Sequence, residues 1–167
     1  MKIALCFSGQ ARSFDKGYEY YKKNLLDHYD VDVFIHSWQF DKQDELVDLY
    51  KPKQYRFDEP LSKEEGGRID AKYTHSPNPK VFPPRFTYSM FKSMFCVQEL
   101  LAMEQFLNRT DYKWVIRTRT DYALNIKIPF KELDNSKLYI PNCRMVPERD
   151  FGNDQFAFSS AQNMRKY

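Results

Sequence analysis

The residues best suited to chemistry end an apolar segment, Trp114-Val-Ile-Arg-Thr-Arg-Thr-Asp121. Such a segment is typical of a buried β-strand, along which alternate side chains point to the same face of the sheet. We therefore expect Arg117, Arg119 and Asp121 to share one face. Two guanidinium groups and a carboxylate are costly to bury without partners. The pattern predicts either an anionic ligand, with the carboxylate facing a metal ion, a sugar hydroxyl or the arginines, or an internal Arg–Asp ion-pair cluster at the sheet edge.

A second polar group, Ser8-Gly-Gln-Ala-Arg12, joins a predicted strand to a predicted helix. Gly9 allows a ligand to approach the backbone, and Arg12 has the reach to bind a phosphate or a base carbonyl. The alternative is a turn glycine followed by a surface arginine. The spacing matches neither G-x-G-x-x-G nor G-x-x-x-x-G-K-[ST], which argues against a dinucleotide-binding Rossmann enzyme and a P-loop NTPase.

Further candidates occur in His36-Ser-Trp38, at the end of another predicted strand, and at Asp154. A lone histidine is more often a hydrogen-bonded structural residue than a catalytic base, and Trp38 either stacks on a nucleobase or closes the core. Asp154 precedes the apolar run 156–158 and is either a general base or a turn or helix-capping carboxylate. The sequence shows no Ser/His/Asp or Cys/His signature of nucleophilic catalysis. It therefore gives no support to a hydrolase with a covalent nucleophile.

The elements that position these residues alternate between strands and helices. Apolar spacing predicts strands at 2–8, 31–38, 54–57, 114–121 and 137–140, and helices at 14–29, 41–50 and 87–108. It also predicts an irregular region at 58–85, and the segment 151–160 ends in what resembles the start of a helix. We expect an α/β fold, with one domain over 1–167 and a mostly parallel sheet flanked by helices. Ligands bind at the carboxyl ends of such strands, so the polar groups should converge on one rim.

Composition narrows the function classes. The 167 residues suit one domain, and the 42% hydrophobic fraction argues against disorder. The net charge is only +3 and charges of both signs are interspersed, unlike in a dedicated nucleic-acid binder. No apolar run approaches the roughly 20 residues of a transmembrane helix, and the first residues suit a strand better than a signal peptide. Cys6, Cys96 and Cys143 show no metal-type spacing, so we expect a reducing, cytoplasmic compartment.

Four motifs follow one another along the chain: Ile3-Ala-Leu-Cys-Phe-Ser-Gly-Gln-Ala-Arg12, Val31-Asp-Val-Phe-Ile-His-Ser-Trp38, Trp114-Val-Ile-Arg-Thr-Arg-Thr-Asp121 and Asn153-Asp-Gln-Phe-Ala157. They are specific in their combination and order, and the resemblance that they carry extends over nearly the whole chain. With them the chain resembles a family of small GT-A-like nucleotide-sugar glycosyltransferases, which occur in bacterial surface-polysaccharide clusters and in some large viruses.

The resemblance implies a nucleotide-diphosphate sugar donor across the carboxyl edge of the sheet and a glycan or lipid-linked acceptor. It assigns donor binding to Ser8, Gly9, Gln10, Arg12, His36, Trp38, Arg117, Arg119 and Asp121. Asp121 would lie near the diphosphate and a divalent cation, Mn²⁺ or Mg²⁺. Asp154 would be the catalytic base that deprotonates the acceptor hydroxyl in an inverting transfer.

The chain departs from this family at the cation site. Many members carry Asp-x-Asp, which gives a divalent cation hard oxygen ligands, whereas this sequence reads Arg119-Thr-Asp121. Either Asp121 and the diphosphate hold the ion with waters, or the arginines neutralise the diphosphate directly. The chain also stops soon after Asp154, so we expect either a truncated chain or a missing part of the acceptor site. A non-catalytic nucleotide- or glycan-binding domain and a sulfotransferase are the alternatives.

Overall fold

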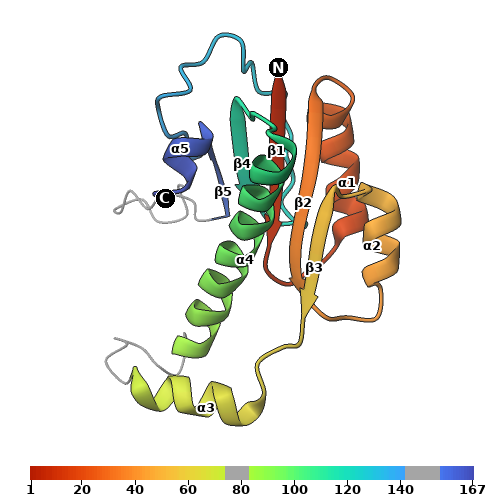
Figure 1. The fold of residues 1–167 in the computed structure, drawn as a ribbon. Coiled ribbons are helices and arrows are strands. Elements are labelled where there is room, and N and C mark those ends of the chain that lie inside the picture. Colours follow the sequence, from red (N-terminus) through yellow and green to blue (C-terminus); the bar gives the residue numbers. More distant parts are fainter. Residues whose placement is uncertain (74–82, 142–154) are drawn as a thin grey trace, which may run out of the picture.

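The structure, a computed structural model, describes residues 1–73, 83–141 and 155–167. Its centre is a five-stranded sheet with the strand order β3-β2-β1-β4-β5 (Figure 1). The strands are β1 (Lys2–Ser8), β2 (Asp30–Trp38), β3 (Gln54–Asp58), β4 (Trp114–Thr118) and β5 (Phe156–Ser159). Strands β1 to β4 run parallel to one another, and β5 is antiparallel to β4. The predicted α/β class with a mostly parallel sheet is confirmed.

Strand β1 is the middle strand of the sheet, and both of its faces are buried. Ile3, Leu5 and Phe7 belong to the apolar core on one face, and Ala4 and Cys6 belong to the core on the other. A near-continuous apolar run is typical of a parallel strand that helices cover on both sides.

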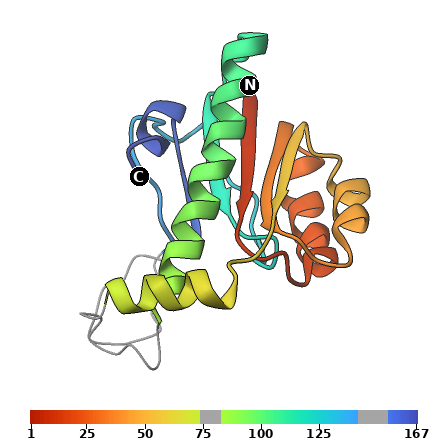
Figure 2. The same ribbon diagram turned by 60° about the horizontal axis from the view of Figure 1, so that its bottom comes forward.

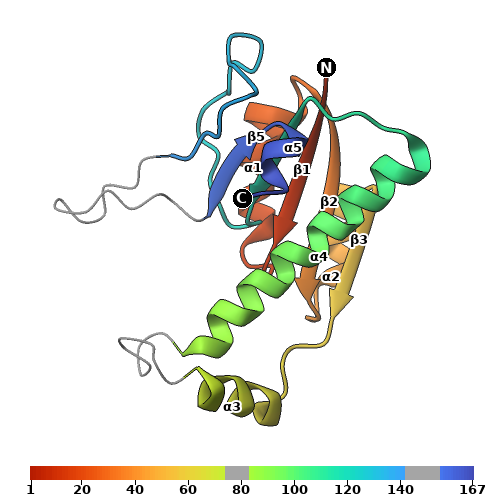
Figure 3. The same ribbon diagram turned by 60° about the vertical axis from the view of Figure 1, so that its left-hand side comes forward.

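Helices cover both faces of this sheet, and Figure 3 shows one long helix crossing the near face with others behind. On the far face lie α1 (Phe14–Tyr21), its π-helical extension η1 (Lys22–Leu26) and α2 (Gln43–Tyr50). The near face carries α4 (Pro84–Asn108), with α3 (Lys63–Lys72) packed against it and α5 (Ala161–Met164) beside β4 and β5. Within the described ranges, none of these helices combines the length and the apolar character of a membrane span.

The order of the strands reverses at β1. The chain passes from β1 through α1 to β2 and through α2 to β3, and α4 then carries it back across the sheet to β4 on the other side of β1. The two routes use opposite faces, as right-handed crossovers require. The carboxyl ends of β1 and β4 therefore border the crevice where ligands bind in open α/β sheets. Figure 2 shows α3 and the first turns of α4 beyond this edge.

The region predicted to be irregular contains a helix, α3. Ser62 and Glu65 form a capping box, in which Ser62 Oγ accepts a hydrogen bond from the Glu65 N–H (3.1 Å) and Glu65 Oε2 accepts one from the Ser62 N–H (3.0 Å). The Ser-x-x-Glu spacing is a signature of a helix start. Gly66 and Gly67 obscured it, because glycine is a poor helix former.

Two strand predictions also need correction. The strand predicted to reach Asp121 ends at Thr118. The strand predicted at 137–140 is reduced to a single bridge to β5. Strand β5 lies in the segment that we expected to lead into a helix, because its run of three apolar residues, 156–158, is too short to distinguish a strand from a helix start by periodicity.

The loop that follows β4 rests directly on α1. A Cβ atom added to Gly17 would lie 1.8 Å from the carbonyl oxygen of Thr120, so only glycine allows this approach. The contact holds residues 119–121 against the helix that follows β1.

Gly17→Ala is expected to destabilise the protein by about 1 to 3 kcal/mol, because the added methyl group forces α1 and the loop apart. Gly67→Ala is the matched control. Gly67 lies in α3 with no atom within 4 Å of an added Cβ, and alanine is expected to stabilise that helix by about 0.5 to 1 kcal/mol. Urea denaturation followed by circular dichroism measures both changes. Unchanged stability of Gly17→Ala would contradict the close packing.

Candidate functional site

A cavity of about 610 Å³ opens at the carboxyl ends of β1 and β4. Its volume lies within the range of small-molecule sites. Seven of the ten predicted site residues line it: Ser8, Gly9, Gln10, Arg12, Trp38, Arg117 and Arg119. The structure thus brings together three segments that are far apart in the sequence, as expected for the rim of a parallel sheet.

The described lining of this cavity, the arginine cavity, is cationic. It includes Arg12, Arg85, Arg117 and Arg119, and no described residue of the lining is an aspartate or a glutamate. Arg85 also contacts Asp70, which lies outside the lining, at 2.9 Å. Guanidinium groups bind phosphate and carboxylate through paired N–H donors. The arrangement therefore favours an anionic ligand.

The turn from β1 into α1 forms one side of the arginine cavity. Gly9 has a φ of +99°, a conformation that favours glycine. Its N–H donates to Ser93 Oγ on α4 (2.6 Å), and the N–H of Ala11 donates to Ser37 Oγ on β2 (3.1 Å). A Cβ added to Gly9 would meet no atom within 4 Å, so this backbone borders open space. The turn is held by its neighbours and still leaves room for a ligand.

The loop after β4 forms the other side and is held by α1. Tyr21 Oη donates to the carbonyl oxygen of Arg119 (3.1 Å) and accepts from Thr118 Oγ1 (2.8 Å). Burial raises the pKa of Tyr21, so the phenol keeps its proton. Thr120 Oγ1 donates to the carbonyl oxygen of Arg12 (3.4 Å), and this contact joins the two sides of the cavity.

The predicted alignment of Arg117, Arg119 and Asp121 on one face is wrong, because the strand ends at Thr118 and a turn follows. Arg117 and Arg119 line the cavity, but Asp121 does not. The carboxylate of Asp121 accepts two hydrogen bonds from Arg119, from Nε at 2.8 Å and from Nη2 at 2.6 Å. An internal Arg–Asp pair therefore exists beside the arginine cavity.

In this structure the carboxylate of Asp121 is paired with Arg119 rather than turned into the arginine cavity. The guanidinium group donates one hydrogen bond to each carboxylate oxygen, so a divalent cation at Asp121 would compete with Arg119. A hard cation requires several oxygen ligands, and within the described ranges no group of three His, Cys, Asp or Glu ligands includes Asp121. That the arginines neutralise a diphosphate directly stays a prediction.

Arg117 is nearly buried, with 6% of its surface exposed. Its guanidinium group lies 4.2 Å from the centre of the Tyr167 ring, which is a cation–π distance. Arg117 borders both the arginine cavity and a smaller cavity of about 270 Å³ between α4 and α5. The ring therefore restrains the guanidinium group at the cavity wall.

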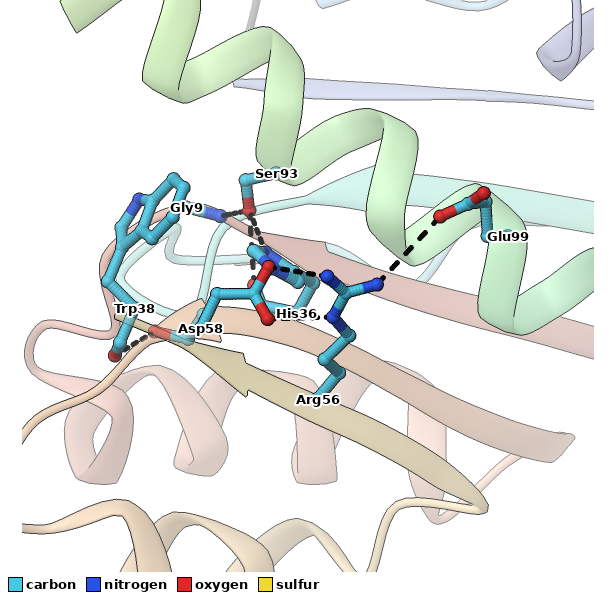
Figure 4. Close-up of polar contacts among 8 residues, drawn as sticks. Gly9, His36, Trp38, Arg56, Asp58, Ser93 and Glu99 are labelled. Atoms are coloured by element: carbon cyan, nitrogen blue, oxygen red, sulfur yellow. Dashed lines mark hydrogen bonds and ion pairs between the residues drawn. The ribbon is translucent and has the colours of Figure 1, made fainter. Parts of the chain in front are cut away.

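His36 does not line the arginine cavity, although we expected it among the donor-binding residues. It is fully buried, with Nδ1 2.7 Å from Ser93 Oγ and Nε2 3.3 Å from Asp58 Oδ2 (Figure 4). Burial lowers the pKa of His36 and Asp58 opposes the change only in part, so the imidazole is neutral at pH 7. The histidine thus ties β2 to α4 and β3, which is the structural alternative that the sequence left open.

Trp38 closes the core, as one of the two expectations had it, and it also borders the arginine cavity. It is 5% exposed and contacts the ring of His36 edge to face, with 5.4 Å between ring centres, so it closes the core. Part of it also lines the arginine cavity, and Lys92 Nζ lies 5.4 Å from its ring centre. It supplies an aromatic wall beside the arginines, which suits a base or a sugar ring.

Helix α4 supplies lining residues that our sequence analysis missed: Arg85, Phe86, Ser89, Met90 and Met94. A helix that connects parallel strands runs antiparallel to them, so its first turns lie at the carboxyl edge. Pro83-Pro84 marks such a helix start, and the two signals together would have indicated this contribution. Asp154 lies outside the described residues, whereas its neighbour Gln155 lines the cavity.

No model of a known protein family matches this chain, and a search of curated proteins found no match. The functional assignment therefore depends on the arginine cavity and on the sequence motifs that meet there.

Proposed function

We propose that the protein is a nucleotide-sugar glycosyltransferase with a GT-A-like fold, which transfers a sugar to a hydroxyl group of a glycan or lipid-linked acceptor. The observation that carries this proposal is the place and charge of the arginine cavity. It lies where the strand order reverses between β1 and β4, and it is lined by Gly9, Arg12, Arg117 and Arg119. A nucleotide diphosphate combines the negative charge and the aromatic ring that this wall is suited to bind.

The arginines supply the electrostatic part of the transfer. As the bond between the sugar and the diphosphate breaks, negative charge accumulates on the leaving diphosphate, and guanidinium groups already in place stabilise it. Arg12 and Arg119 come from opposite sides of the cavity. When a phosphate oxygen replaces Asp121, Arg119 exchanges one anionic partner for another and its charge stays paired.

Asp154 is the proposed catalytic base. The acceptor hydroxyl loses a proton as it attacks the sugar carbon, and a carboxylate near the acceptor takes that proton. The next residue, Gln155, lines the arginine cavity, which supports a role for this motif in the reaction.

We expect one donor among UDP-, GDP- and dTDP-sugars to raise the midpoint of thermal unfolding, with EDTA as well as with manganese, because a ligand of the folded state stabilises it. Arg12→Gln should weaken binding of that donor about tenfold, which is the loss of one charge-assisted hydrogen bond. Arg68→Gln is the control, because Arg68 is exposed on α3 and pairs with Glu64. No shift with any donor would contradict the proposal. A shift with adenosine 3′,5′-bisphosphate alone would indicate a sulfotransferase.

Asp121→Asn is expected to strengthen binding of the matching nucleoside diphosphate in EDTA, because Arg119 then loses its internal competitor. A metal-ligand role of Asp121 predicts the opposite, namely weaker binding that manganese no longer improves. Isothermal titration calorimetry separates the two results. Asp27→Asn removes an exposed partner of Lys22 and should leave the affinity unchanged.

Asp154→Asn is expected to lower turnover by a factor on the order of 10² to 10⁴ with little change in donor affinity, which is the usual contribution of a general base. Release of nucleoside diphosphate in the presence of a panel of acceptor glycans gives the rate. A turnover equal to that of the unaltered protein would exclude Asp154 as the base. Donor binding without any release of diphosphate by the unaltered protein would indicate a non-catalytic binding domain.

A further inference from the structure

We propose that His36, Asp58 and Cys96 form a transition-metal site, with Zn²⁺ as the ion that their chemistry favours. One ligating atom from each side chain lies within 4.8 Å of the others. The site is separate from the cation expected at Asp121, and it does not depend on the proposed transfer reaction. His36 and Asp58 belong to the polar network between β2, β3 and α4 that Figure 4 shows beside Trp38.

Each of the three ligands comes from a different packed element. His36 lies on β2, Asp58 at the end of β3 and Cys96 in α4. His36 is 0% exposed and Cys96 4%, whereas the side chain of Asp58 keeps 18% of its surface exposed. Rigid elements hold ligand geometry well. The exposed part of Asp58 leaves the site open to an ion from solvent.

The set of donor atoms selects the metal. Imidazole nitrogen and thiolate are ligands of zinc and related transition metals, whereas magnesium and manganese prefer oxygen. Zn–N and Zn–S bonds of about 2.0 and 2.3 Å place tetrahedral ligands about 3.3 to 3.6 Å apart. The ligating atoms already lie within 4.8 Å, so small side-chain shifts reach this geometry. Three protein ligands leave the fourth position for water.

Ser93 provides the outer contact that a metal-bound histidine requires. Its hydroxyl lies 2.7 Å from His36 Nδ1 and 3.3 Å from the carbonyl oxygen of His36. When Ser93 donates to the carbonyl, His36 Nδ1–H donates to Ser93, and Nε2 turns a lone pair toward the carboxylate of Asp58 at 3.3 Å. In the other tautomer Ser93 donates to Nδ1 and Nε2–H donates to Asp58, so an ion displaces the Nε2 proton. In both cases, once an ion is bound to Nε2, the hydrogen bond from Nδ1–H to Ser93 supports the imidazole, as is usual for a metal-bound histidine.

Arg56 competes with the metal for Asp58. Its Nε and Nη2 atoms donate to the two carboxylate oxygens at 2.7 and 2.8 Å. The side chain of Arg56 is 48% exposed and also lies 4.0 Å from Glu99, so it has a second carboxylate to turn to when a metal takes an oxygen of Asp58. Arg56 therefore sets how readily the site accepts an ion.

Titration of the full chain with Co²⁺, which replaces zinc and reports its ligands by absorption, tests this site. We expect one ion per chain, with the bands of a tetrahedral site and a thiolate-to-cobalt charge-transfer band. Cys96→Ser should remove that band and lower zinc affinity by at least about tenfold, since even changes outside the ligand shell cost that much. Cys6→Ala is the matched control, because Cys6 is also a buried free thiol but lies on β1. Cys143→Ala is a second control, and the band should persist in both.

Arg56→Gln distinguishes a metal site from a purely structural network. Without the guanidinium group, zinc affinity measured by competition with a chelator should rise, whereas a structural network gains no metal. Asp58→Asn should lower zinc affinity, and it replaces Cys96→Ser if circular dichroism shows that the latter does not fold. Absence of the charge-transfer band in the unaltered protein would overturn the proposal. Its persistence in folded Cys96→Ser, or unchanged zinc affinity in Asp58→Asn, would do the same.

Discussion

The geometry of the carboxyl edge depends on one buried hydroxyl group. Ser93 of α4 contacts Gly9 in the turn after β1, and it contacts both the imidazole and the backbone carbonyl of His36 on β2. A hydroxyl has one proton and two lone pairs, so it can satisfy a backbone donor and still choose between two acceptors. A helix, the central strand and its neighbour thus meet at this hydroxyl group.

The arginine cavity is held from both faces of the sheet. Helix α4 fixes the turn after β1, and α1 fixes the loop after β4 through Gly17 and Tyr21. Arg85 and Arg119 each have a carboxylate partner outside the lining, so the folded chain holds these cations close together without leaving their charge uncompensated. Both pairs are partly exposed, so the exchange of a carboxylate for another anion keeps the charge compensated at a small cost in free energy. On the proposed function, the diphosphate of the donor takes over that role.

The sequence predicted the sheet and its rim because apolar runs that end in polar residues report local structure. It could not predict contacts between distant segments. The strand ends at Thr118, and contacts with Gly17 and Tyr21 hold the loop that follows against α1. In the turn of this loop, Asp121 pairs with Arg119 and does not line the cavity. His36 lies near the end of β2, but the alternation of side chains places its imidazole on the face of the sheet that α4 covers. Only the packing of that helix shows that the imidazole is buried.

The two sides of the arginine cavity come from segments far apart in the chain. The hydrogen bond from Thr120 to the carbonyl of Arg12 spans 108 residues, and the one between Tyr21 and Thr118 spans 97. Closing loops of this length costs conformational entropy before the contacts form, which makes such topologies slow to fold. A chain that is still being synthesised, or one that has folded only its first three strands, therefore lacks the side of the arginine cavity that the loop after β4 forms. On the proposed function, binding of the anionic donor therefore requires the complete fold rather than any of its parts.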